Sequence, residues 1–285
     1  MIMRTIGVVG AGVMGSDIAL DMAAHNHKVL LIDLSDEALE RARVRIRRSY
    51  SLAKMMKKST CELSLDSILG RINFLLDYDA FSHADIVIEN ITEKYEAKKR
   101  VFSQLGEVCS SNALIGTNTS CISVSRLSAS MPHPENVVGM HFMNPAHLKP
   151  FVEVIRGKQT SSETVNRTKS FLRESGKHCV VVEDMPGFVS NKVLMITINE
   201  SIRLLQDKIA KPKDIDAVFK LGFGHKMGPL ATADLIGLDT IYDSLMVLYE
   251  SYGDSKYKPC ELLCKMVDEG TFGIKSGKGF FEYGI

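Results

Sequence analysis

A serine, a histidine and a glutamate stand at the ends of three successive apolar runs, where they could carry out proton transfer. Ser120 closes GTNTS, His141 lies in VVGMHFMNP, and Glu153 lies in FVEVI. An imidazole that donates one ring proton to a carboxylate keeps its other nitrogen available as a base. Alone, His141 would more often be a packed core residue, and Glu153 a strand carboxylate that reaches solvent. Together, the residues predict a general base oriented by an acid.

The first element that could position this chemistry is a glycine-rich turn. In IGVVGAGVMGSDIA a buried-strand run passes through three spaced glycines into a helix. Gly10 would permit the tight turn, Gly12 would let the backbone approach a pyrophosphate, and Gly15 would let the helix pack closely on the strand. The N–H groups around Val13 and Met14 would then meet the phosphates at the helix N-terminus. The alternative is a glycine-rich turn that binds no ligand.

Asp33 indicates which dinucleotide would bind. It ends a second apolar run at a position near the ~20-residue spacing expected of an acid that binds ribose. A carboxylate there accepts hydrogen bonds from the ribose hydroxyls but would repel a 2′-phosphate, so NAD is favoured over NADP. The alternative is a solvated acid or a helix N-cap before SDEALERA, where Ser35 or Asp36 could also cap.

Apolar runs recur between amphipathic segments along the first two thirds of the chain. They are IGVVG, KVLLID, INFLL, ADIVIEN, ALIGTN, NVVGMHF, FVEVIRG and CVVVED. This alternation is typical of a largely parallel sheet with covering helices. After Met185-Pro186-Gly187 the pattern changes to long helix-like segments such as FVSNKVLMITINESIRLLQD. We therefore predict an α/β fold, with a dinucleotide-binding domain over residues 1–184 and a mostly α-helical domain over residues 185–285.

Composition and charge limit the class of partner. Among 285 residues, 35 Lys plus Arg face 34 Asp plus Glu, so the net charge of +1 provides no global field for nucleic acid or a membrane surface. The six cysteines include no C-x-x-C pair, so we predict neither a metal site nor disulfides. We expect the cysteines to be free thiols in a reducing cytoplasm. No apolar stretch reaches the ~18 residues needed to span a bilayer.

Several segments, in order, carry a resemblance to one family. They are GAGVMGSDIA, SNALIGTNTS, GMHFMNP, FVEVIRG, PGFVSNKVL, MGPLATADLIGLD, GDSKYKP and KSGKGFFEY. On these segments the chain resembles the L-3-hydroxyacyl-CoA dehydrogenases, particularly the bacterial 3-hydroxybutyryl-CoA type, from end to end. The resemblance implies a Rossmann-like domain followed by a helical domain that dimerises. It also implies NAD-dependent oxidation of an L-3-hydroxyacyl thioester to the 3-ketoacyl thioester.

The resemblance further implies roles for single residues. His141 would be the base that removes the hydroxyl proton, and Glu153 would orient it. Ser120 would hydrogen-bond the reacting oxygen, and Asn191 would complete the polar contacts from the second domain; without a ligand, these two would be an ordinary cap and a helix-face amide. The implied cofactor contacts are Glu93, Lys98, Asn118, Asn144 and Lys275.

A basic segment, RARVRIRRSYSLAKMMKKS at residues 41–59, contains no acidic residue. Adjacent uncompensated charges weaken a helix, so we expect an anionic partner there, with a solvated helix face as the alternative. In the family a serine and a lysine of this region contact coenzyme A. Ser51 and Lys58 match them, which makes both predicted substrate contacts.

One loop, NPAHLKPFVEV, departs from the usual family pattern, which is similar to NPVPVMKLVEV. His147 and Lys149 replace apolar residues near the acyl pocket, where burial against methylenes would leave them unpaired. We therefore predict that both contact the substrate and favour a polar or carboxylated acyl group. Some family members act on acyl carrier proteins, and an acidic carrier helix would complement the basic segment. Acyl-CoA and acyl carrier protein thioesters both stay open as substrates.

Other classes of function also stay open. The Tyr-x-x-x-Lys spacing of short-chain dehydrogenases occurs at Tyr95 and at Tyr252, although the G-x-x-x-G-x-G turn of that class is absent. A 3-hydroxyisobutyrate-type dehydrogenase would use a helix lysine, for which Lys192 is the candidate, and would not need His141 with Glu153. A structural or NAD-sensing protein on the same scaffold would bind NAD without turnover.

Overall fold

The computed structural model describes residues 2–56 and 63–284. The chain divides into two compact units, residues 1–185 and residues 186–285. The division falls one residue after the expected position, directly before Pro186.

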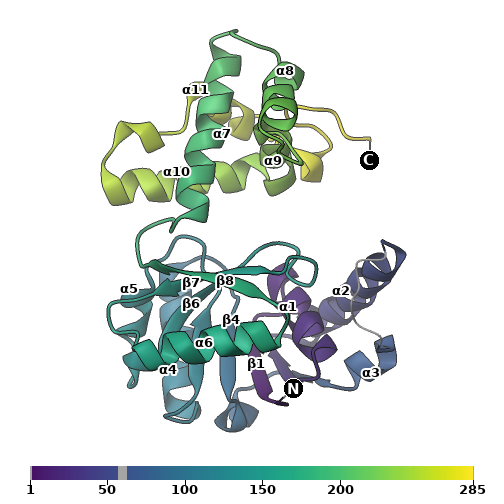
Figure 1. The fold of residues 1–285 in the computed structure, drawn as a ribbon, viewed down its shortest axis with the longest axis vertical. Coiled ribbons are helices and arrows are strands. Elements are labelled where there is room, and N and C mark those ends of the chain that lie inside the picture. The colour runs from purple at the N-terminus through teal and green to yellow at the C-terminus, as the bar shows by residue number, and fades with distance from the viewer. Residues whose placement is uncertain (1, 57–62, 285) are drawn as a thin grey trace. The chain divides into compact units, whose positions relative to one another are not determined.

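The first unit is built on an eight-stranded sheet in the order β3-β2-β1-β4-β5-β6-β7-β8 (Figure 1). The strands are β1 (Thr5–Val9), β2 (Lys28–Ile32), β3 (Ile72–Leu75), β4 (Ile86–Glu89), β5 (Leu114–Thr117), β6 (Val137–Phe142), β7 (Phe151–Arg156) and β8 (His178–Glu183). Neighbouring strands are parallel except for β6 and β7, which are antiparallel. Each strand lies in one of the eight apolar runs, and the predicted α/β class with a largely parallel sheet is confirmed.

Helices cover this sheet. They are α1 (Val13–Ala24), α2 (Asp36–Met55), α3 (Leu65–Leu69), α4 (Tyr95–Val108), α5 (Val124–Ser128) and α6 (Ser162–Glu174), with short 3₁₀ turns at Asp79–His83 and Pro134–Asn136. One continuous core packs α1, α2, α3 and α6 on alternate strand residues such as Ile6 and Val8, because successive strand side chains point to opposite faces. In Figure 1, α6 crosses in front of the sheet.

The strand order places a ligand crevice beside β1. The chain moves outward from β1 through β2 and β3 on one side and through β4 to β8 on the other. At such a reversal the loops at the carboxyl ends of neighbouring strands separate, and open α/β sheets bind their ligands there. The glycine-rich turn follows β1 at that point.

The second unit is helical, as predicted. It consists of α7 (Ser190–Gln206), α8 (Pro212–Ala217), a π-helical turn (Val218–Gly222), α9 (Pro229–Ile236), α10 (Leu238–Tyr252) and α11 (Glu261–Asp268), with 3₁₀ turns at Ser255–Tyr257 and Ile274–Ser276. Its own core gathers buried side chains from α7, α9, α10 and α11, including Ile198 and Leu245.

Within residues 2–56 and 63–284 the cysteines Cys109, Cys121, Cys179, Cys260 and Cys264 are free thiols. No group of His, Cys, Asp or Glu side chains within residues 2–56 and 63–284 is arranged to hold a metal ion. In the same ranges, every helix is too short or too polar to cross a bilayer.

Candidate active site

The structure brings the predicted base and acid together on neighbouring strands. His141 of β6 lies directly opposite Glu153 of β7 in the antiparallel register. Glu153 Oε2 lies 3.2 Å from His141 Nδ1, and Ser120 Oγ lies 3.2 Å from His141 Nε2. An ionised carboxylate only accepts hydrogen bonds, so Nδ1–H donates to Glu153 and the Nε2 lone pair accepts from the Ser120 hydroxyl. This tautomer directs the basic nitrogen at Ser120.

One detail of the prediction was wrong, because Glu153 does not stand at a strand end. It is the third residue of β7, and it reaches His141 because β7 runs antiparallel to β6. Glu153 is 2% exposed and His141 8% exposed, with Val152 and Val154 fully buried beside the acid. Burying a carboxylate among apolar side chains is costly unless it is paired. The imidazole contact helps to meet that cost and orients the ring.

Glu93 contacts the turn that contains Ser120. Its Oε1 accepts hydrogen bonds from the backbone N–H groups of Ser120 and Cys121, each at 2.9 Å, and from the Thr119 hydroxyl. Burial by itself would raise the pKa of Glu93, but the Lys98 charge and these hydrogen bonds hold that pKa below its usual value. Glu93 is therefore an anion that holds the backbone of the Ser120 turn.

Lys98 belongs to a buried network that the sequence did not reveal. Its side chain is fully buried, and Nζ lies 2.7 Å from Glu89 Oε1 and 3.5 Å from Glu93 Oε2. Glu89, at the end of β4, also accepts from Thr117 Oγ1 at 2.7 Å. The carboxylate of Glu89, the second-last residue of the apolar run ADIVIEN, was the available signal. Direct contact of Lys98 with a cofactor stays a prediction, whereas its contact with two carboxylates is observed.

The glycine turn has the geometry that a pyrophosphate requires. Gly10 has a φ of +90°, a backbone conformation that residues other than glycine rarely adopt. A Cβ on Gly15 would lie 1.8 Å from the Gly10 carbonyl oxygen, so only glycine allows α1 to pack this closely. A Cβ on Gly12 would meet nothing within 4 Å. The space over Gly12 is thus open, next to the N-terminus of α1, and the residues fit a bound dinucleotide.

Asp33 is held at the same turn. Its Oδ2 accepts a hydrogen bond from Ala11 N at 2.6 Å, and its Oδ1 accepts from Leu34 N at 2.7 Å. The N-cap of α2 is Ser35, whose Oγ accepts from Ala38 N. Asp33 is therefore not the helix cap, and each of its oxygens keeps a further lone pair for a ribose hydroxyl.

Two asparagines were predicted to touch the cofactor. Asn118 follows β5 and bridges to β6, since its Oδ1 accepts from Phe142 N and its Nδ2 donates to Asn90 Oδ1, both at 2.9 Å. Asn144 is exposed in the loop that follows β6. Both lie at the carboxyl ends of their strands, on the same edge of the sheet as the glycine turn.

The other predicted residues lie in several places. Ser51 is exposed in the last turn of α2, and Lys58 lies outside the described residues. Asn191 is in the first turn of α7 in the helical unit. In that unit Lys275 pairs with both carboxylate oxygens of Asp239.

His147 has a different environment from the one predicted. Its imidazole side chain is 7% exposed, and Nδ1 lies 3.1 Å from Asp17 Oδ2 on α1. The ring thus lies against an acid inside the first unit, although neither of its nitrogens makes a hydrogen bond of acceptable geometry with the described residues. Contact of His147 with the substrate stays a prediction. Lys149 is exposed in the same loop. The sequence signal was Asp17, one of two acids on the largely apolar helix α1.

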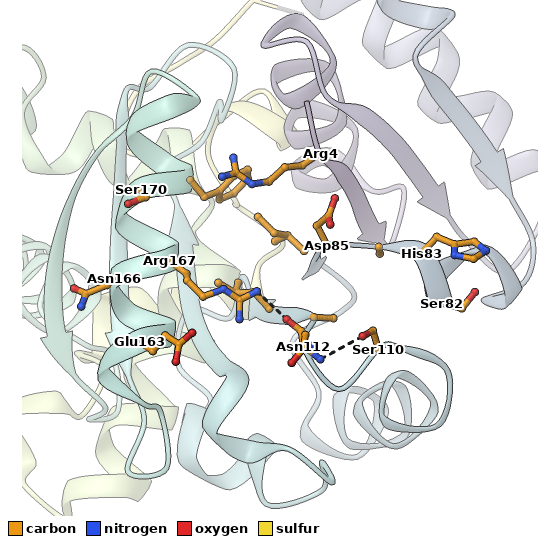
Figure 2. A pocket seen from close by; sticks show the side chains of 15 residues that line it. Arg4, Ser82, His83, Asp85, Ser110, Asn112, Glu163, Asn166, Arg167 and Ser170 are labelled. Carbon is orange, nitrogen blue, oxygen red and sulfur yellow. Dashed lines mark hydrogen bonds between the residues drawn. The ribbon is translucent and has the colours of Figure 1, made fainter. Parts of the chain in front are cut away.

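The cavity drawn in Figure 2 is not part of this site. Its volume is about 830 Å³, and it lies against Arg4, Asp85 and Asn112, which precede strands β1, β4 and β5. Figure 2 shows Arg167 of α6 reaching Asn112, whose carbonyl accepts a hydrogen bond from the guanidinium at 2.8 Å. The cavity therefore opens at the amino ends of these strands, opposite the edge that carries His141.

Comparisons with known proteins decide the family. A family model described as "3-hydroxyacyl-CoA dehydrogenase, NAD binding domain" matches residues 5–185, and its companion, the C-terminal domain, matches residues 187–283. The chain belongs to the 3-hydroxyacyl-CoA dehydrogenase family. It is accordingly an NAD-dependent oxidoreductase with a Rossmann-like first domain, and the resemblance inferred from the sequence is confirmed.

Individual relatives of this dehydrogenase match over its whole length. A probable 3-hydroxybutyryl-CoA dehydrogenase of Bacillus subtilis is 43% identical and covers 99% of this chain and 98% of its own. The crystal structure of a (S)-3-hydroxybutyryl-CoA dehydrogenase from Ralstonia eutropha has a TM-score of 0.93 at 38% identity, with both chains covered fully. A 3-hydroxyadipyl-CoA dehydrogenase of Escherichia coli is 36% identical over 98% of this chain and 59% of its own. The short-chain and 3-hydroxyisobutyrate-type alternatives are therefore set aside.

Proposed function

We propose that this dehydrogenase oxidises L-3-hydroxybutyryl-CoA, or a short relative of it, to the 3-ketoacyl-CoA with NAD. The single observation that carries the proposal is the His141 ring held between Glu153 and Ser120, with Nε2 directed at the serine hydroxyl. Oxidation of a secondary alcohol needs a base at the hydroxyl while a hydride leaves the carbon. A substrate hydroxyl that takes a place beside Ser120 Oγ would meet that base.

Each residue has a defined task in this mechanism. His141 Nε2 accepts the hydroxyl proton, and the Glu153 carboxylate stabilises the imidazolium that results. Ser120 donates a hydrogen bond to the reacting oxygen and holds it near Nε2. We assign Asn191, from the helical unit, the remaining polar contact to the substrate, as the family resemblance implies.

The cofactor would be held by the glycine turn and its neighbours. Bound NAD would supply the acceptor for the hydride that leaves C3 of the substrate. The N–H groups at the start of α1, with Gly12, Val13 and Met14, would receive the pyrophosphate, and Asp33 would accept from the ribose hydroxyls. We assign the remaining cofactor contacts to Glu93, Lys98, Asn118, Asn144 and Lys275.

Coenzyme A is the carrier that we propose. The carrier-protein alternative depended partly on His147 at the acyl pocket, and His147 Nδ1 lies 3.1 Å from Asp17 Oδ2 on α1. Ser51, exposed at the end of the basic helix α2, supports a contact with the coenzyme A portion. Names of the matched relatives point to acyl-CoA substrates as well.

We further propose that the helical unit, residues 186–285, forms a homodimer and contributes to the substrate site, and that the enzyme works in the cytoplasm. Large apolar side chains are exposed on this unit, among them Leu221 at 86%, Ile209 at 70% and Phe223 at 67%. Exposed apolar side chains that gather into one patch commonly mark protein interfaces. Light scattering after gel filtration would give twice the 31.6 kDa chain mass if the proposal is right.

The activity is tested by following NADH formation with purified protein. We expect turnover with L-3-hydroxybutyryl-CoA and NAD, and much slower turnover with NADP or the D isomer. The 3-hydroxyadipyl-CoA and carrier-protein thioesters serve as comparison substrates. NAD binding without NADH formation from any of these thioesters would contradict the proposal and favour a structural or NAD-sensing role.

A further inference from the structure

The loop of residues 143–150 connects the two strands that carry the catalytic pair. It leaves β6 two residues after His141 and enters β7 three residues before Glu153. It also carries Asn144, a proposed cofactor contact. Any displacement of this loop would therefore move the base, the acid and a cofactor contact together.

Lys177, directly before β8, holds this loop through its ammonium group. Nζ donates hydrogen bonds to the carbonyl oxygens of Ala146, at 2.7 Å, and Lys149, at 3.1 Å. It also lies 2.7 Å from Asp21 Oδ2 on α1. The contact with Asp21 is an ion pair by distance, and Asp21 Oδ2 accepts no hydrogen bond of acceptable geometry from the described residues. The Lys177 and Asp21 side chains are each only 4% exposed, so this contact is inside the unit and not on its surface.

His147 makes a second contact between the same loop and the same helix. Its Nδ1 lies 3.1 Å from Asp17 Oδ2, and the two side chains are 7% and 5% exposed. The other Asp17 oxygen accepts a hydrogen bond from Ser49 Oγ of α2 at 3.1 Å. Asp17 and Asp21 are one helical turn apart, so α1 presents two buried acids, one to His147 of the loop and one to the Lys177 that holds the loop.

The helix that holds the loop is the helix that would receive the cofactor. α1 begins directly after Gly12, and Asp17 and Asp21 lie in its second and third turns. Buried ion pairs gain little net stability, because desolvation offsets most of their attraction, but they can specify one arrangement of packed elements. His147 joins the loop to Asp17 of α1 directly, and Lys177 joins the loop carbonyls to Asp21 of α1. Together these contacts fix where the catalytic hairpin lies relative to the phosphate-binding turn.

We propose that Asp17, Asp21, His147 and Lys177 form a clasp that aligns the catalytic hairpin with the bound dinucleotide. Lys177 and His147 are positioning residues: they act through the loop on Asn144, His141 and Glu153. This inference rests on the proposed function for its effect on turnover. Its effect on loop mobility and on dinucleotide binding does not depend on the identity of the substrate.

The test replaces Lys177 with methionine, which keeps the length of the side chain and removes its donors. The matched control is Lys169→Met, at an exposed lysine of α6. We expect Lys177→Met to speed amide hydrogen exchange in residues 143–150 and to weaken NADH binding about 3- to 30-fold. We also expect kcat to fall ~10- to 100-fold at saturating substrates, since a displacement of about 1 Å can cost that much. Lys169→Met should leave all three measurements unchanged.

A folded Lys177→Met protein with wild-type loop exchange and wild-type NADH affinity would overturn the proposal. If that variant does not fold, His147→Gln and Asp17→Asn provide the same three measurements at the second contact. Wild-type loop exchange and NADH affinity in both would again overturn it. Absence of turnover by the wild-type enzyme would instead contradict the proposed function, while the exchange and NADH measurements would still test the clasp.

Discussion

The catalytic contribution of Glu153 can be isolated by changing it to glutamine. The substitution keeps the shape of the side chain and removes the charge next to His141 Nδ1, 3.2 Å away. At an effective dielectric constant of ~20 the charge pair formed with an imidazolium at this distance is worth about 5 kcal/mol, which is an upper bound. The net value of a hydrogen bond to a charged group is ~1.5–3 kcal/mol. We therefore expect kcat to fall about 10- to 150-fold.

A second effect acts in the same direction. The glutamine amide can donate to Nδ1, which would place the ring proton on Nε2 and remove the basic lone pair that faces Ser120. The assay is NADH formation at saturating NAD and 3-hydroxybutyryl-CoA, with Glu163→Gln, an exposed glutamate of α6, as the matched control. Binding of NAD, measured by calorimetry, should not change. A folded Glu153→Gln enzyme with kcat within about threefold of wild type would refute the reasoning.

Three further predictions concern cofactor binding and stability. Gly12→Ala should leave the melting temperature unchanged but weaken NAD binding, whereas Gly15→Ala should lower the melting temperature, because its Cβ would overlap a backbone carbonyl of the glycine turn. Equal melting temperatures for the two variants would contradict this. Lys98→Met should lower the free energy of unfolding by ~3–5 kcal/mol in urea titrations, because it leaves the fully buried Glu89 unpaired, and Glu89→Gln in the same protein should recover part of the loss. Burial, with a smaller effect from a nearby arginine, lowers the pKa of His27 to about 4. The unfolded chain therefore binds more protons than the folded chain between pH 6.5 and 4, so the stability contribution of His27, at most ~3 kcal/mol, should be complete above pH 6.5 and lost as the pH falls towards 4. His27→Gln should flatten that part of the stability profile, and an unchanged slope would argue against it.

Much of the fold was predictable because the strand signal is local. Each of the eight apolar runs became a strand, and the glycine spacing located the turn after β1. The antiparallel β7 was missed, although the eight residues 143–150 that join it to β6 are too few for a helical crossover. Loop length was thus the signal that would have shown how Glu153 reaches His141.

Buried polar contacts were less predictable, because they join residues far apart in the chain. His147 and Asp17 are 130 positions apart, and neither residue type specifies its partner. The same holds for Glu93 and Ser120, whose backbone N–H donates to Glu93. The family resemblance identified Glu93 only as a cofactor contact and Ser120 only as a catalytic residue. Side-chain charge in the sequence identifies candidates for such networks, but packing decides which pairs form.

We propose that His141 is the base of this hydroxyacyl-CoA dehydrogenase. His141→Asn removes the ring that lies between Glu153 and Ser120, and the glycine turn at the start of α1 is untouched. Turnover of 3-hydroxybutyryl-CoA at saturating NAD should fall ~10²- to 10⁴-fold while the dissociation constant for NAD stays the same. A near-normal rate in this variant would contradict the account.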